Sequence, residues 1–482
     1  MHDRSLSLVF TAVLLSSLNA QVTVDWIQDG GLSLALDQEN NVFTVNYDAN
    51  LGGDITLTKR NADGELQWIA NYDQTSTTRF DRATWVATDP QGNAFVSGTV
   101  MSGFSTPVSA NSLLMKFSPA GDVLWREEYA SDFDGSSTRK CLVDLAGNAY
   151  VLGLRTVPNG QVSTVRKFDP EGSTLWQWFD AGIGAPVNIK FTPDSAMVIA
   201  HRSLTGNLNG YTKLDRDGDP IWSIGGVASF TTGDVAGDAF GNSYLVHTGA
   251  QSGSNAVLRK VSSTGEEVWQ NDYPITAFRV EVGTDHAPVL SGFPLVGSGG
   301  AAFLKVDADG AQQWVNNDAD GVNNFLLHAQ MMLDADNSAY LCAGVLFNMG
   351  ICKVNSDGAN AWDITAGTGA SQGFALGADG AVYVTGGSTM RIGQDISNGV
   401  GSTARGTAMA LAYPVPTRDQ IFVTWEGHTI TDWRIFSTTG ALLDQGVYNG
   451  VALDVQQLPS GMILIELVDQ TGERTQVRVQ KQ

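Results

Sequence analysis

The chain is poor in positive charge, and it has few cysteines and prolines. Its 482 residues include 28 Lys and Arg against 50 Asp and Glu, so the formal net charge is −22. Nucleic acids and anionic membranes attract proteins through clustered Lys and Arg, and the acidity therefore argues against both as the main partner. After the first 20 residues no stretch approaches the roughly 18 apolar residues of a membrane helix, so we expect no transmembrane segment. Phosphate-loop, dinucleotide-binding and zinc-protease motifs are absent from the sequence as well.

Amphipathic stretches with a helical period are also missing, whereas short strands and turns are favoured. Only 16% of the residues are charged, 43% are hydrophobic and 54 are Gly. This composition argues against wholesale disorder and is typical of a chain with many short strands joined by tight turns. The sequence therefore predicts an all-β protein.

Residues 1–20 have the features of a signal peptide. Arg4 supplies a positive charge, the segment from Leu6 to Leu18 is an apolar run, and Asn19-Ala20 offers a cleavage site. We expect cleavage after Ala20 and export of a soluble mature protein.

A unit with constant inner spacing recurs seven times along the chain. A turn Gly follows a Lys by five residues, and a Trp follows this Gly by four. The copies are Lys59-Gly64-Trp68, Lys116-Gly121-Trp125, Lys167-Gly172-Trp176, Lys213-Gly218-Trp222, Lys260-Gly265-Trp269, Lys305-Gly310-Trp314 and Lys353-Gly358-Trp362. The distance between units varies, which indicates a rigid hairpin joined to the next by loops of free length.

A second hairpin alternates with the first. Its clearest copies have an Asp-x-x-Gly-Asn-Ala-aromatic pattern, and alternating apolar residues precede them. The eight copies are Asp37–Phe43, Asp89–Phe95, Asp144–Tyr150, Thr192–Val198, Asp238–Tyr244, Thr284–Leu290, Asp334–Tyr340 and Gly377–Tyr383. Two hairpins in about 47 residues make four strands, which is the size of one propeller blade. We expect the Trp to pack between neighbouring sheets and the Lys to lie at a solvated strand end.

The two ends of the repeat region complement each other. The eighth hairpin lacks a Trp unit after it, while the segment Val22–Trp26 is a fourth strand without a preceding hairpin. We therefore expect this N-terminal strand, with Trp26, to complete the last blade and close the ring over residues 21–396. The sequence thus predicts an eight-bladed β-propeller.

These repeats resemble those of secreted bacterial β-propeller repeat proteins. The segment Val306–Trp314 is also similar to the tryptophan-docking repeats of quinone-dependent dehydrogenases. Both resemblances imply an eight-bladed ring, but many propellers with this pattern are not catalytic. The dehydrogenases would further imply a stacking Trp at the ring centre, a Ca²⁺ site and two adjacent Cys, and the sequence contains no Cys-Cys pair.

The C-terminal segment has a different pattern. After a Gly/Ser/Thr-rich linker at residues 397–407 come Tyr413–Thr417, Trp433–Gly440 and Leu453–Gly461, and then a final alternating strand. This order resembles the type A C-terminal sorting domain of the type IX secretion system of Bacteroidetes. The resemblance implies a small Ig-like β-sandwich over residues 408–482, with the type IX secretion machinery as its partner.

Few residues are candidates for chemistry. Cys342 and Cys352 flank one hairpin of the seventh blade, and the alternatives are a cross-strand disulfide or two free thiols. The sequence Asp215-Arg216-Asp217-Gly218 and its relatives contain part of a calcium loop, but Asp and Gly are equally what a tight turn requires. His201 and His247 occupy equivalent places in adjacent blades, too far apart to share a metal ion. We therefore predict no catalytic, cofactor-binding or metal-binding residue.

The sequence favours an exported, non-enzymatic propeller that presents a binding surface. We expect it outside the cell or at the cell surface, reached through the periplasm, with an extracellular protein or glycan as ligand. The long loops Asn46–Asp54, Tyr129–Arg139 and Asn316–Asn324 would form this surface. The alternatives are a quinone-dependent dehydrogenase or a glycan-acting propeller enzyme, and the latter would need two carboxylates facing each other.

Overall fold

The computed structural model describes residues 22–48, 54–72, 80–101, 110–129, 136–157, 160–180, 184–203, 207–229, 231–251, 253–295, 300–319, 325–345, 348–394, 410–413, 420–425, 429–437, 442–470 and 474–481. The predicted signal segment with Ala20 and the predicted linker 397–407 lie outside these residues. The chain forms two compact units, residues 1–396 and 397–482. Within the described part of the chain all regular structure is strand, so no helix there could cross a membrane.

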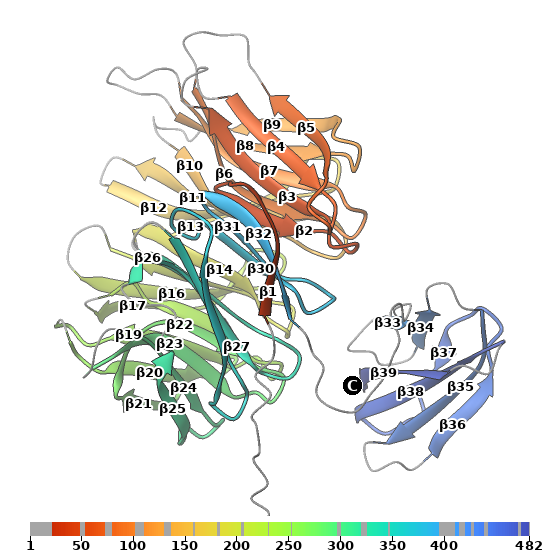
Figure 1. The fold of residues 1–482 in the computed structure, drawn as a ribbon. Helices are drawn as coiled ribbons and strands as arrows, with labels where there is room; N and C mark the ends of the chain where they lie inside the picture. The colour runs from red at the N-terminus through yellow and green to blue at the C-terminus, as the bar shows by residue number, and fades with distance from the viewer. Residues whose placement is uncertain are drawn as a thin grey trace, which may run out of the picture. The chain divides into compact units, whose positions relative to one another are not determined.

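Eight antiparallel four-stranded sheets make up the first unit (Figure 1). The first sheet contains β2 (Ser33–Leu36), β3 (Val42–Asp48), β4 (Asp54–Arg60) and β5 (Leu66–Tyr72). The second contains β6 (Phe80–Thr88), β7 (Ala94–Met101), β8 (Ala110–Phe117) and β9 (Val123–Tyr129). The third contains β10 (Ser136–Val143), β11 (Ala149–Val157), β12 (Gly160–Phe168) and β13 (Thr174–Asp180). The fourth contains β14 (Ala185–Phe191), β15 (Met197–Arg202), β16 (Leu208–Leu214) and β17 (Pro220–Ala228).

The remaining sheets follow the same order. The fifth contains β18 (Asp234–Gly237), β19 (Ser243–Thr248), β20 (Ala256–Val261) and β21 (Glu267–Tyr273). The sixth contains β22 (Ile275–Val282), β23 (Pro288–Pro294), β24 (Ala301–Val306) and β25 (Gln312–Ala319). The seventh contains β26 (Phe325–Leu333), β27 (Ala339–Val345), β28 (Asn348–Val354) and β29 (Asn360–Ala366). The eighth contains β30 (Gly373–Leu376), β31 (Val382–Thr385), β32 (Ser388–Gln394) and β1 (Val22–Asp29).

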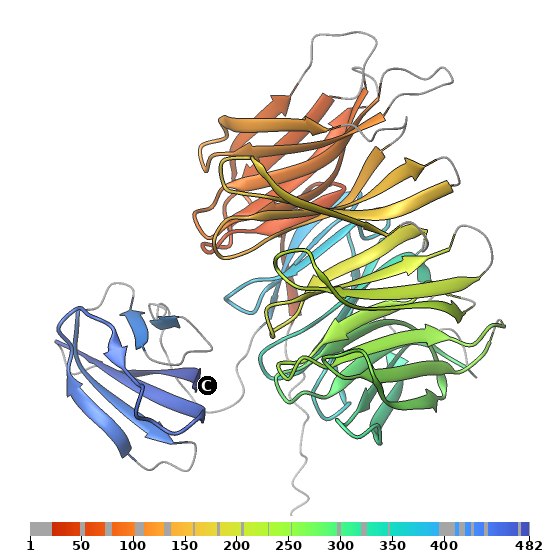
Figure 2. The same ribbon diagram turned by 180° about the vertical axis from the view of Figure 1, so that it is seen from behind.

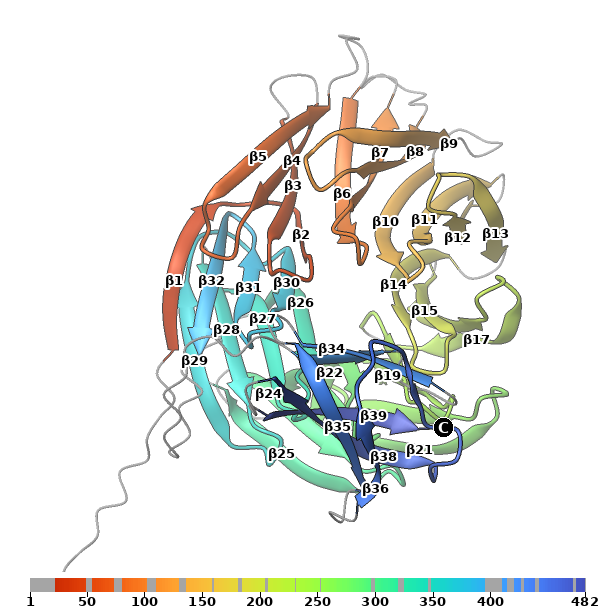
Figure 3. The ribbon, with the colours of Figure 1, turned by 90° about the vertical axis from the view of Figure 1, so that its right-hand side faces the viewer.

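The sheets follow one another around a ring. The first strand of every sheet contacts the first strands of both neighbouring sheets, from β2 and β6 through to β30 and β2. Figure 2 shows the sheets succeeding one another in sequence colour, and Figure 3 shows the first strands toward the ring centre and the fourth strands at its rim. This arrangement is an eight-bladed β-propeller, as predicted.

The N-terminal strand closes the ring. β1 pairs antiparallel with β32, from Val22 opposite Gln394 to Asp29 opposite Ser388, and it is the outermost strand of the eighth sheet. Arg391 on β32 forms ion pairs with Asp25 on β1 and with Asp379. Hydrogen bonds and ion pairs therefore join the two ends of the propeller.

The core lies between adjacent sheets rather than in one central layer. Successive side chains of a strand point to opposite faces, and all six residues of β24 are buried, so both faces of a sheet pack on its neighbours. Between the first two sheets, for example, Phe43 and Leu57 pack in one cluster with Val86 and Val96, and all four are at most 1% exposed.

The C-terminal unit is a sandwich of two sheets. One contains β33 (Ala410–Tyr413), β34 (Gln420–Trp425) and β37 (Leu453–Asp454), in that order. The other has the order β36 (Leu442–Val447), β35 (Ile430–Ser437), β38 (Gly461–Asp469) and β39 (Arg474–Lys481). Ile421 and Val423 of the first sheet share a buried cluster with Ile435, Ile465 and Leu467 of the second, which is the Ig-like arrangement expected.

Candidate functional site

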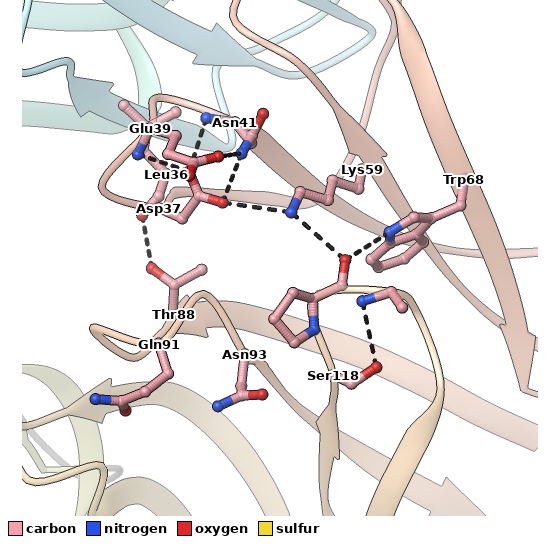
Figure 4. A network of polar contacts seen from close by, with 12 residues as sticks. Leu36, Asp37, Glu39, Asn41, Lys59, Trp68, Thr88, Gln91, Asn93 and Ser118 are labelled. Atoms are coloured by element: carbon pink, nitrogen blue, oxygen red, sulfur yellow. Dashed lines mark hydrogen bonds and ion pairs between the residues drawn. The ribbon is translucent and has the colours of Figure 1, made fainter. Parts of the chain in front are cut away.

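The repeated tryptophans pack across the boundary between neighbouring sheets, as predicted. Trp68 of the first sheet lies over Gly121 in a turn of the second, and its Nε1 donates to the Pro119 carbonyl oxygen at 2.9 Å (Figure 4). Gly121 has a φ of 93°, and a Cβ there would lie 3.0 Å from the Trp68 ring, so this position favours glycine. The same packing joins Trp26 to Gly64, Trp125 to Gly172, Trp176 to Gly218, Trp222 to Gly265, Trp269 to Gly310 and Trp314 to Gly358.

The last junction of the series uses a side chain instead of a turn. The eighth sheet has no Gly turn before its fourth strand, because this strand is β1. Trp362 Nε1 donates to Gln394 Oε1 at 3.2 Å, and Lys353 Nζ donates to the same oxygen at 3.4 Å. Gln394 thus replaces the backbone carbonyl that accepts from the Trp at six of the other junctions.

The prediction that the repeated lysines lie at solvated strand ends is wrong. Lys59 is only 9% exposed, and its Nζ lies 3.4 Å from Asp37 Oδ2 and 3.5 Å from the Pro119 carbonyl oxygen. Figure 4 shows Lys59 and Trp68 directed at this one carbonyl group. Because Asp37 begins the first-hairpin turn, the Asp turn, the Lys and the Trp form one junction between sheets.

The Asp-rich turns bind their own backbone. Asp215 Oδ1 accepts the N–H groups of Asp217 and Asp219, both at 2.9 Å, and Asp307 makes the equivalent contacts in its turn. A carboxylate that bonds the N–H groups two and four residues later is typical of an Asx turn. These contacts favour the turn interpretation over the calcium one.

Of the two alternatives for Cys342 and Cys352, the structure favours free thiols over a disulfide. Cys352 lies opposite Leu341, and Cys342 lies opposite Ile351, so the register is offset by one residue. Because successive side chains of a strand point to opposite faces, the two thiols point away from each other. Cys352 packs toward the sixth sheet and Cys342 toward the eighth, and both are free and buried.

The two histidines belong to the packing of their own sheets. His201 is fully buried, its Nε2 lies 3.2 Å from Thr212 Oγ1, and burial lowers its pKa to about 3. His247 Nδ1 lies 3.0 Å from the Thr248 carbonyl oxygen. His201 is therefore neutral at physiological pH.

The innermost strand of every sheet has one residue at an equivalent position. We define the axial position of a sheet as the residue four before the first residue of its first-hairpin turn. The axial residues are Ser33, Trp85, Lys140, Asn188, Asp234, Arg279, Gln330 and Gly373. The sixth turn begins at Gly283, one residue before the predicted start. Five innermost strands have a register shift that ends at the axial residue, and the other three strands begin there. Since a β-bulge re-aims the side chains beside it, the backbone sets this position apart.

Side-chain contacts join the axial residues of the third, fourth and fifth sheets. Lys140 Nζ donates to Asn188 Oδ1 at 2.9 Å, and Asn188 Nδ2 donates to Asp234 Oδ1 at 3.0 Å. Lys190, two residues after Asn188, lies 2.9 Å from Asp234 Oδ2 and 2.8 Å from Glu281 Oε1. Glu281 belongs to the sixth sheet, so Lys190 reaches past the fifth sheet, near the centre of the ring. We call Lys140, Asn188, Lys190, Asp234, Arg279 and Glu281 the axial cluster.

At Lys190 and Asp234, attraction between opposite charges affects the pKa values more than burial does. Burial opposes the charge of both Lys190 and Asp234, but attraction to oppositely charged neighbours raises the pKa of Lys190 and lowers the pKa of Asp234. At Glu281 burial prevails and raises the pKa of the carboxyl group. Lys190 and Asp234 are therefore held as an ion pair.

Lys140 has a different environment from Lys190. Burial, and to a lesser extent the charge of Lys190, lowers the pKa of Lys140 to about 8. Its Nζ lies 5.3 Å from the centroid of the Trp85 ring and bonds Asn188, but no carboxylate among the described residues lies within ion-pair distance. Among the described residues, Lys140 is thus a half-buried cation without a carboxylate partner.

Sequence reasoning missed the axial cluster, although the sequence contains a signal for it. The chain has ten lysines, of which seven belong to the repeats and one, Lys481, lies near the C-terminus. The remaining two are Lys140 and Lys190. The predicted binding loops, by contrast, lie partly outside the described residues, which omit 49–53, 130–135 and 320–324.

Comparison with known proteins identifies the C-terminal unit. Residues 411–481 match the family of the secretion system C-terminal sorting domain. No curated protein matches the chain. Among solved structures, the WD40 β-propeller domain of Doa1 is 10% identical, over 78% of this chain and 98% of that one, with a TM-score of 0.41. The β-propeller domain of the Trilobed protease from Pyrococcus furiosus is 11% identical, over 63% and 89%, with a TM-score of 0.41. A protein of unknown function from Bacteroides caccae is 12% identical, over 67% and 92%, with a TM-score of 0.35.

Proposed function

We propose that this exported propeller is a non-enzymatic binding protein and that its ligand contacts the axial cluster. The proposal rests on one observation: the charged axial residues Lys140, Asp234 and Arg279 all belong to the third, fifth and sixth sheets. The axial residues of five sheets are uncharged: Ser33, Trp85, Asn188, Gln330 and Gly373. Five of the eight sheets thus join the ring without a charged axial residue, which supports a role for the charged arc other than ring packing.

The state of Asp234 favours binding over catalysis. Its side chain is 1% exposed, and it accepts hydrogen bonds from Lys190, Asn188 and the Val280 N–H group. A general base must reach the proton that it removes. A carboxylate so occupied is suited to holding Lys190 and Asn188 in place.

A glycan-acting enzyme is the second candidate, and one observation favours it. The carboxylates of Asp234 and Glu281 lie 2.9 and 2.8 Å from the same Nζ of Lys190, and their pKa values move in opposite directions. Paired carboxylates with opposed pKa shifts are the pattern of a glycosidase acid and nucleophile. Here, however, the ammonium group of Lys190 contacts both carboxylates.

A quinone-dependent enzyme has weaker support. Trp85 on β6 is an aromatic residue at an axial position, but Lys140 covers its ring, and the three cysteines of the chain are not adjacent. An absorbance spectrum of the protein after addition of quinone and Ca²⁺ tests this alternative, since bound quinone would give a new band.

Binding and turnover can be separated in one experiment. The full chain is applied to an array of oligosaccharides and extracellular proteins, and the eluates are analysed by mass spectrometry. We expect a retained ligand of unchanged mass, with weaker retention of a Lys140→Gln variant. Shortened oligosaccharides that appear with the wild type and disappear with both Asp234→Asn and Glu281→Gln would instead establish the glycosidase.

The C-terminal sorting domain predicts the route of export. We propose that it directs the propeller through the type IX secretion system to the cell surface or the medium. The propeller already has all its strands without the C-terminal unit. Removal of residues 408–482 should therefore leave a folded propeller in the periplasm, and the same segment fused to a folded reporter should carry it outside. Normal surface levels of the truncated protein would contradict this.

A further inference from the structure

Lys140 is the least compensated charge of the axial cluster. The cluster contains three cations, Lys140, Lys190 and Arg279, and two carboxylates, Asp234 and Glu281. Both carboxylates bind Lys190. Within the cluster Lys140 therefore has no carboxylate of its own, in a chain whose net charge is −22.

The ammonium group of Lys140 has few partners. Among the described residues its Nζ makes one hydrogen bond, to Asn188 Oδ1 at 2.9 Å, and otherwise faces the Trp85 ring. A repeated lysine such as Lys116, in contrast, bonds a carbonyl of the next sheet and pairs with Asp89. A half-buried cation without a counter-ion is unfavourable in the free protein, and an anion would relieve it.

We propose that Lys140 is the anion-binding residue of the axial cluster and that the ligand presents a carboxylate or sulfate group to its Nζ. The inference rests on the proposed binding function and names the chemistry of the ligand. The acidic surface of an exported protein repels polyanions, so the anion is recognised at this point and not by general attraction. An acidic polysaccharide or a free sugar acid can supply such a group.

Binding of the anion and protonation of the Lys140 amine should favour each other. The charged groups that act on it are Lys190, Glu281, Asp234 and Arg279, while β6 contributes the uncharged Trp85. With a pKa of about 8, Lys140 is protonated in most molecules at pH 7 but in roughly one in ten at pH 9. We therefore expect binding to weaken about tenfold between these pH values.

The test measures binding of the full chain to polygalacturonate, dextran sulfate and neutral dextran by affinity electrophoresis. Monomeric galacturonate serves as competitor. We expect retention by at least one polyanion and not by dextran, a loss of at least tenfold in Lys140→Gln, and recovery in Lys140→Arg. Arg259→Gln is the matched control, because Arg259 lies on β20 and bonds Gln270 of the outermost strand β21. It should bind like the wild type.

The outcomes separate this inference from the proposed function. Competition by galacturonate would support a free sugar acid as the source of the anion, and retention by the polymer alone would support a polysaccharide. Equal binding by Lys140→Gln with an unchanged melting temperature would overturn the inference. Binding of only neutral glycans or proteins would also overturn it and leave the binding function standing. Failure to retain any member of the array would overturn the binding function itself.

Discussion

The repeated lysines and the two lysines of the innermost strands are all withdrawn from water, but their surroundings differ. Lys116 is 7% exposed, bonds the Pro170 carbonyl oxygen at 3.2 Å and lies 3.4 Å from Asp89 Oδ2. Lys190 is shared between two carboxylates of other sheets. Lys140 has an amide and an aromatic ring, and no carboxylate partner among the described residues.

This difference separates contacts that the packing of the ring requires from charges that it does not require. A contact that recurs at each junction is explained by the packing of one sheet on the next. A charge that occurs in one arc of the ring cannot be explained in that way. In a repeat protein the departures from the repeat are therefore the first places to look for a site.

Removal of the closing strand should have the largest effect, because it breaks a repeated junction and a sheet at once. Deletion of Val22–Trp26 removes most of the pairing with β32 and the contact of Trp26 with Gly64. We expect aggregation or a fall in melting temperature on the order of 10 °C. Calorimetry and size-exclusion chromatography would measure this. A monomeric variant with the wild-type melting temperature would show that β1 does not hold the ring closed.

The fold was largely predictable because the same turn and strand signals recur in almost every blade. Eight first-hairpin turns and seven Lys-Gly-Trp units fix the strand count, and the orphan segment before residue 27 completes it. What the pattern left open or predicted wrongly concerns single residues. A shift of one residue in register separates Cys342 from Cys352, and a pattern of turns does not show that Lys59 folds back onto the next sheet.

The comparison of lysines can be tested directly with two matched substitutions. Lys116→Met leaves the buried carboxylate of Asp89 without its cation, and we expect a loss of about 3 kcal/mol in the free energy of unfolding. Lys140→Met removes an uncompensated charge, and we expect no loss or a gain of up to about 1 kcal/mol. Chemical denaturation of both variants at pH 7 measures the difference. Similar losses in the two variants would contradict the distinction between the two sets.

The pH dependence of the Lys140→Met effect has a defined sign. The pKa of Lys140 is lowered from 10.5 to about 8 in the folded protein, so between these values the unfolded chain binds more protons. Wild-type stability from this group therefore rises as the pH increases through 8. The advantage of Lys140→Met should shrink over the same range.

The axial cluster was not predicted because it is assembled across sheets. Lys190 and Glu281 are 91 positions apart and belong to the fourth and sixth sheets. The sequence does show that Lys140 and Lys190 fall outside the repeats. What it cannot show is that bulges precede Lys140 and Asn188 in adjacent sheets, because a bulge depends on pairing with the next strand.

The smallest expected effect lies within the repeated junctions themselves. Trp176 Nε1 donates to the Arg216 carbonyl oxygen at 3.0 Å, whereas Trp222 Nε1 is buried without a partner among the described residues. Trp176→Phe and Trp222→Phe remove the same ring volume, but only the first also breaks a hydrogen bond, and the second relieves an unsatisfied donor. We expect Trp176→Phe to be less stable than Trp222→Phe by about 1 kcal/mol, measured by urea denaturation. Equal stability would mean that the indole contributes to these junctions through packing on glycine alone.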